Sequence, residues 1–112
     1  MKQDYFKETR FAVTICDEKG IIIYMNDKSV KTFEKYGGAA LVGQSLLDCH
    51  PEPSKSILAD MLITHNENSY TIEKNGIKKI IHQTPLFVDG KFSGYIELSI
   101  EIPMDMPHFI RK

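Results

Sequence analysis

The segment from Phe11 to Gly37 constrains the fold of this chain more than any other part of its sequence. In its first six residues, large apolar side chains alternate with smaller ones, which is the period of two expected for a β-strand. The loop at residues 17–20 ends in Gly20, which can take the positive φ of a tight hairpin turn. Residues 21–25 are rich in β-branched side chains and predict the returning strand. The first third of the chain is therefore expected to contain a β-hairpin.

A short helix is expected directly after this hairpin. Asn26 and Asp27 are good N-cap residues, because either side chain can accept hydrogen bonds from the free N–H groups of a first helical turn. Val30 and Phe33 then recur at helical spacing, and Gly37 can end the helix.

A longer helix is predicted after a proline-rich link. Pro51 and Pro53 disfavour helical structure in the residues that precede them. Ser54 can begin a new helix, because its hydroxyl can act as an N-cap. The apolar stripe of this helix consists of Ile57, Leu58, Met61 and Leu62.

The last third of the chain predicts three antiparallel strands. Asn75-Gly76 and Asp89-Gly90 are typical two-residue hairpin turns. In residues 92–102 the isoleucines and the leucine share one face, and the glutamates lie on the other. Such alternation is typical of a sheet with one face on the core, so we expect the aliphatic face to pack there. The order of elements is that of an α+β fold, with helices on one face of a five-stranded sheet.

Composition limits the classes of function. A chain of 112 residues is expected to form one domain, here residues 11–102, with a leader or leader helix over 1–10 and a C-terminal strap over 103–112. The formal net charge of −1 gives no basic excess for nucleic acid. No apolar run approaches the ~20 residues of a membrane span, and two cysteines are too few for a disulfide framework. We therefore expect a cytoplasmic protein with neither a nucleic-acid nor a membrane partner.

Taken in order, these segments resemble a PAS (sensory box) domain over about residues 8–102. The matching segments are FAVTICDEKGIIIYMN with Asn26 at its end, the short helix with Val30 and Phe33, LVGQSLLDCHPEPSKSILADML, and DGKFSGYIELSI. The run Asp-Cys-His-Pro is similar to a PAS subgroup with a Cys-His-Pro linker. The resemblance implies an antiparallel sheet in the order 2-1-5-4-3, with short helices on one face and a pocket between them.

The resemblance also implies roles for individual residues. Asn26 and Gly43 are expected to be structural, with the Asn26 side chain tying the end of its strand to neighbouring backbone. The implied function is a non-catalytic sensor module for signal transduction, which binds a small ligand or a protein partner and forms a homodimer. Tyr5 and Phe6 are the expected dimer contacts, and an effector protein in trans is a further partner. The expected ligand-pocket residues are Ile15, Tyr24, Phe33, Leu47, Leu58, Met61, Leu62, Ile81 and Leu98.

Other interpretations stay open at this point. One is a haem-binding PAS sensor with His50 as the axial ligand, since a neutral imidazole is a good iron ligand. Another is a ligand-free dimerisation module whose pocket is filled by side chains. A Cys-His hydrolase is disfavoured because the adjacent Cys49 and His50 would point apart, and we expect no enzyme. A flavin is not expected, because the residues after Gly43 differ from a photoreactive segment, and no His and Cys spacing indicates a metal site.

Overall fold

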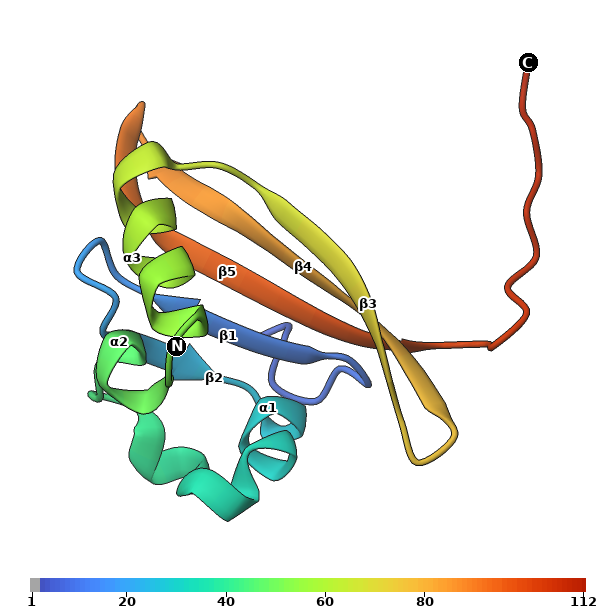
Figure 1. The fold of residues 1–112 in the computed structure, drawn as a ribbon, viewed down its shortest axis with the longest axis horizontal. Helices are drawn as coiled ribbons and strands as arrows, with labels where there is room; N and C mark the ends of the chain where they lie inside the picture. The colour runs from blue at the N-terminus through green and yellow to red at the C-terminus, as the bar shows by residue number, and fades with distance from the viewer. Residues whose placement is uncertain (1–2) are drawn as a thin grey trace.

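The computed structural model describes residues 3–112, apart from the side chain of Cys49. The elements in chain order are β1 (Ala12–Cys16), β2 (Ile22–Met25), α1 (Asp27–Thr32), η1 (Glu34–Tyr36), η2 (Gly38–Leu41), α2 (Leu46–Cys49), α3 (Ser54–Thr64), β3 (Asn68–Lys74), β4 (Ile77–Val88) and β5 (Lys91–Ile102). The strands form one antiparallel sheet in the order β2-β1-β5-β4-β3, which confirms the predicted topology. In Figure 1, α3 lies across the sheet, the shorter helices gather near β2, and the C-terminal tail leads away.

Asn26 is the polar centre of the first third of the chain and is almost completely buried. Its Oδ1 accepts hydrogen bonds from the backbone N–H of Val13, at 2.9 Å, and from that of Ser29, at 3.0 Å. Its Nδ2 donates to the carbonyl oxygens of Phe6 and Phe11, at 2.8 and 2.9 Å. One side chain therefore caps α1 and also ties β1 to the leader, because every hydrogen-bonding atom of a buried amide needs a partner.

The leader lies against the end of β2 and the start of α1. The Tyr24 hydroxyl donates to the Asp4 carboxylate at 2.8 Å, and Lys7 Nζ lies 3.0 Å from the Asp27 carboxylate. Residues 5–8 form turns, whereas a helix was one of the expectations for this segment. Tyr5 and Phe6 are exposed, with 81% and 43% of their surface accessible.

The two faces of the sheet differ from what the strand pattern predicts. On β5, Tyr95 and Glu97 face the helices, whereas Ile96 and Leu98 lie on the opposite face, together with Ile15, which pairs with Ile96. The expectation that the aliphatic face of the last strand packs against the helices is therefore wrong. Alternation shows which residues share a face, but the chain connections decide which face the helices cover.

Two close contacts hold β5 in place against its neighbours. Gly94 has φ +136°, and a Cβ atom built on it would lie 1.9 Å from the Cys16 carbonyl oxygen, so only glycine fits where β5 passes β1. The buried Tyr95 donates its hydroxyl to the carbonyl oxygens of Met61, at 2.7 Å, and Asn66, at 2.9 Å. These bonds join β5 to the end of α3. None of the helices in the described part of the chain is long and apolar enough to cross a membrane.

Candidate functional site

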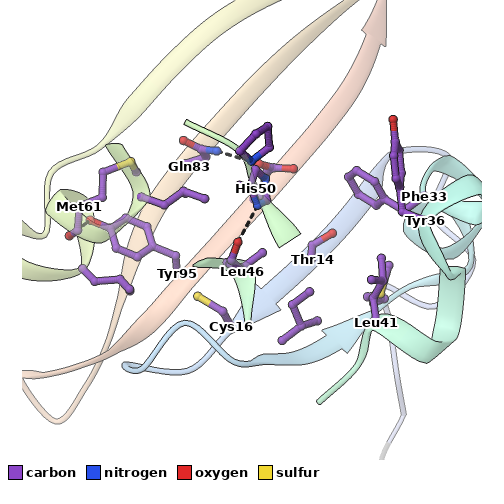
Figure 2. A pocket seen from close by; sticks show the side chains of 16 residues that line it. Thr14, Cys16, Phe33, Tyr36, Leu41, Leu46, His50, Met61, Gln83 and Tyr95 are labelled. Atoms are coloured by element: carbon purple, nitrogen blue, oxygen red, sulfur yellow. Dashed lines mark hydrogen bonds between the residues drawn. The ribbon is translucent and has the colours of Figure 1, made fainter. Parts of the chain in front are cut away.

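A cavity of about 460 Å³ lies between the covered face of the sheet and the helices. Sixteen residues line it, and most of them are apolar (Figure 2). In the view of Figure 2, Met61 and Tyr95 lie at one end, Phe33 and Tyr36 at the other, and His50 and Gln83 between them. The volume is within the range of about 300–1,000 Å³ that is typical of small-molecule pockets.

The first hairpin supplies the floor of the cavity. Thr14 and Cys16 alternate with Ile15, so both point to the covered face. A bulge in the pairing of β1 with β2 between Ile15 and Cys16 shifts the register, and as a result Ile22 and Met25 both line the cavity although they are three residues apart.

The helices supply the apolar walls. Leu58, Met61 and Leu62 share one face of α3, because residues three and four apart lie above one another on a helix. In α2 the Ser45 hydroxyl accepts from the Leu47 N–H at 3.2 Å and caps the helix, which places Leu46 in the cavity wall.

A polar cluster interrupts these apolar walls. Gln83 Nε2 donates to the Glu97 carboxylate at 2.7 Å, and Gln83 Oε1 accepts from Asn68 Nδ2 at 3.1 Å. His50 Nδ1 lies 2.7 Å from the Leu46 carbonyl oxygen (Figure 2). Burial raises the pKa of Glu97, and the hydrogen bond from Gln83 and the nearby His50 lower it by less.

The cysteine that lines the cavity does not have the character of an activated nucleophile. Cys16 is buried, and burial raises the pKa of its thiol. A reactive cysteine needs the opposite shift, because the thiolate is the nucleophile. The side chain of Cys49 lies outside the described residues, so the expectation that it points away from His50 stays a prediction. Within the described part of the chain, no group of three His, Cys, Asp or Glu side chains could hold a metal ion.

The structure places four of the predicted pocket residues together around the cavity, along with His50, the axial ligand in the alternative haem interpretation. The four are Phe33, Leu58, Met61 and Leu62. All of them come from helical segments, where the apolar stripe of the sequence points to the sheet.

The other five predicted pocket residues lie elsewhere. Ile15, Tyr24 and Leu98 are on the uncovered face of the sheet, because the face was assigned by hydrophobicity alone. Leu47 is outside the lining, and it is Leu46, the residue before it, that lines the cavity. Ile81 is buried on the covered face of the sheet but does not line the cavity. The residues missed by this assignment are the polar and small members of the same strands: Thr14, Cys16, Gln83, Tyr95 and Glu97.

Gly43, which the sequence marks as structural, sits in the link between η2 and α2. Its φ of +94° is one that side chains rarely adopt, and its N–H donates to the Ile22 carbonyl oxygen at 2.8 Å. The link is thereby attached to β2, so that α2 starts beside the cavity.

No family model matches the sequence, and no curated protein matches it. Several solved structures have the same fold. A C-terminal domain from Streptococcus mutans gives a TM-score of 0.69 at 15% identity, over 86% of this chain and 78% of that chain. The PAS domain of Bordetella pertussis BvgS gives 0.64 at 17% identity, over 88% and 81%. The Vibrio cholerae Aer2 receptor, described as a dual PAS-haem oxygen sensor, gives 0.60 at 18%, over 83% and 95%. The chain has the PAS fold.

Proposed function

We propose that this chain is a non-catalytic PAS sensor module that binds a small ligand between its sheet and its helices. The observation that carries this proposal is the cavity of about 460 Å³, with apolar walls and a few polar groups at one place. Cavities with that mixture are typical of small-molecule sites, in which apolar walls supply affinity and polar groups set orientation. Structures with the same fold include sensor proteins, which agrees with this role.

A chain of hydrogen bonds offers a route from the cavity to the leader. The hydroxyl of Thr14, in the cavity floor, is hydrogen-bonded to the hydroxyl of Ser29. The Ser29 N–H donates to Asn26 Oδ1 at 3.0 Å, and Asn26 Nδ2 donates to the Phe6 carbonyl oxygen at 2.8 Å. A ligand that favours one position of Thr14 would therefore shift the population of leader positions.

The partner that we propose is a second copy of the chain. Tyr5 and Phe6 expose apolar surface on the leader, and a half-buried aliphatic row lies on the uncovered face of the sheet. Exposed apolar patches of this kind commonly mark interaction sites. A homodimer through the leader would join the hydrogen-bonded route of one copy to that of the other.

Outside the cavity, the group formed by Ser69, His82 and Glu67 does not have the geometry of a catalytic triad. Ser69 is hydrogen-bonded to His82 Nδ1, and His82 Nε2 lies 3.9 Å from the Glu67 carboxylate. That separation is too long for the hydrogen bond that orients a catalytic histidine. Ser69 and Glu67 are also exposed to solvent and His82 is half-buried, so the group lacks the dry surroundings that strengthen electrostatic catalysis.

Hydrogen exchange of the leader amides tests this proposal, with toluene as the probe ligand. Binding of toluene should change the rate of hydrogen exchange at the backbone amides of residues 5–9 in the wild-type protein. The variant Thr14→Val keeps the shape of the side chain and removes its hydroxyl, so it should bind toluene while the leader no longer responds. Thr71→Val on β3 removes a hydroxyl outside the route and serves as the control.

Two results would count against the proposal. If neither toluene nor a charged one-ring analogue of it binds, the cavity is no ligand site, and a ligand-free dimerisation module becomes the better account. If toluene binds and the leader responds equally in Thr14→Val, the signal does not pass through the Thr14 hydroxyl.

A haem-binding sensor is the alternative that His50 suggests. The bond from Nδ1 to the Leu46 carbonyl would leave Nε2 for iron, as in many haem and metal sites. The rest of the lining fits haem poorly, because its described residues include the Glu97 carboxylate and no lysine or arginine for the two propionates. On titration with haem, we therefore expect no Soret band that depends on His50. A Soret band that appears in the wild-type protein and is lost in His50→Ala would favour the haem sensor.

A further inference from the structure

Glu97 is the one carboxylate among the described residues that line the cavity, and it lies in a mainly apolar wall. Gln83 donates one hydrogen bond to it, at 2.7 Å. An ionised carboxylate has about four lone-pair sites for such bonds. Asn68 donates to Gln83 Oε1 at 3.1 Å, which keeps the amide of Gln83 turned with its NH₂ group towards Glu97. The Glu97 carboxylate is thus held in place by one fixed hydrogen-bond donor and can accept a hydrogen bond from a further donor.

His50, the second polar group in this part of the cavity, is also suited to accept a hydrogen bond. A carbonyl oxygen only accepts, so His50 Nδ1 must carry the hydrogen that it shares with Leu46. In the neutral ring Nε2 is then an acceptor. The described lining contains no lysine or arginine that could donate to either group. With the His50 ring neutral, the polar cluster in the described lining therefore contains no cationic donor.

The electrostatic balance points in the same direction. Burial is the larger influence on Glu97 and raises its pKa, which means that the ionised form is costly in this wall. A cation brought in by a ligand would offset this cost, because opposite charges attract strongly where water is excluded. An anionic ligand would add a second negative charge beside the first.

We propose that the cavity takes a small, mainly apolar ligand that carries a protonated amine or amidine, and that this group donates its N–H hydrogens to Glu97. Leu58, Met61 and Phe33 form the apolar walls against which the rest of the ligand packs. Charge-assisted hydrogen bonds of this kind are roughly twice as strong as neutral ones. This inference rests on the proposed function, because it assigns the ligand class of the same cavity.

Calorimetric titration with three one-ring probes tests the inference. Benzylamine carries the cation, toluene carries no charge, and benzoate carries the opposite charge. Benzylamine should bind about tenfold more tightly than toluene, and benzoate should bind least. Glu97→Gln should lower the affinity for benzylamine to that for toluene. Glu101→Gln is the matched control, because Glu101 lies on the same face of β5, outside the cavity, and should leave the preference unchanged.

The outcomes separate this inference from the function on which it rests. If toluene binds and benzylamine binds no better, the site is a ligand pocket and the ligand class is wrong. The same holds if Glu97→Gln keeps the preference for benzylamine while still binding toluene, which shows that the variant is folded. If none of the three probes binds at millimolar concentration, the inference and the proposed function both fall.

Discussion

The two faces of the sheet differ most clearly on β5, where Tyr95 and Glu97 face the helices and Ile96 and Leu98 face away from them. The face that the helices cover carries Thr14, Gln83 and Glu97 around a cavity, whereas the uncovered face carries Ile15, Ile96 and further aliphatic side chains. Burying polar groups under helices is costly unless they are hydrogen-bonded. A sheet whose covered face served only for packing would gain more from the aliphatic residues. This difference agrees with the ligand site that we propose on the covered face and with the dimer contact that we propose on the uncovered face.

Both faces depend on the close passage of β5 along β1, and breaking it should have the largest effect. Gly94→Ala would place a methyl group 1.9 Å from the Cys16 carbonyl oxygen. We expect the free energy of unfolding to fall by about 3 kcal/mol, as in severe overpacking. Urea denaturation measures this. Gly90→Ala is the control: its methyl group meets open space at φ +78° and should cost about 1 kcal/mol. Equal losses in the two variants would refute the close passage.

A charge on the uncovered face should weaken the proposed homodimer and spare the cavity. Ile96→Lys places an ammonium group in the aliphatic row, and we expect the dimer dissociation constant to rise at least about tenfold, or about 1.4 kcal/mol. Sedimentation velocity measures the association, and toluene affinity should not change. Ile63→Lys is the control, because Ile63 on α3 is already 78% exposed. A wild-type protein that is monomeric at micromolar concentration would contradict the assignment of this face.

The bond between β5 and α3 closes one end of the cavity and should contribute a smaller amount. Tyr95→Phe removes the hydroxyl that donates to the carbonyl oxygens of Met61 and Asn66, although Met61 keeps the bond from the His65 N–H at 2.8 Å. We expect a loss of about 1–2 kcal/mol in the free energy of unfolding. Tyr70→Phe, on the same face of the sheet but 44% exposed, should cost less than half as much. A similar loss in both variants would show that the hydroxyl of Tyr95 adds nothing specific.

The pH dependence of stability should show the cost of the buried carboxylate, and this effect is the smallest. The native pKa of Glu97 is raised, so as pH increases past the ordinary Glu pKa of about 4.3, the unfolded state loses its proton first. The unfolded state then binds fewer protons, and wild-type stability falls until pH exceeds the native pKa of Glu97. Glu97→Gln removes this fall, so it should gain stability relative to wild type as pH rises. A difference that does not vary with pH would contradict the raised pKa.

Hairpin turns and the Asn26 cap could be predicted because each depends on local residue chemistry, whereas the order of strands in the sheet followed from the resemblance to PAS domains. Asn26, for example, accepts from the N–H of Ser29 as an N-cap should. The strand pattern also separated Tyr95 and Glu97 from Ile96 and Leu98 correctly. It could not show which set the helices cover, because that is decided by contacts between residues far apart in the sequence.

The cavity could be predicted only in part, for the same reason. The apolar stripe of α3 identified Leu58 and Met61, since a helix buries one side. The bulge that brings both Ile22 and Met25 to the cavity has no signal in the alternation of β2. Gln83 and Glu97 were hidden because polar residues on a strand usually indicate solvent exposure.

Methyl NMR during a titration with toluene tests the central claim most directly, because it reads the two faces separately. The methyl groups of Ile22, Leu58 and Met61 report on the cavity, and those of Ile15, Ile96 and Leu98 report on the uncovered face. We predict saturable shifts of the first set, while the second set moves little. Shifts confined to the second set, or none in either, would contradict a ligand site on the covered face.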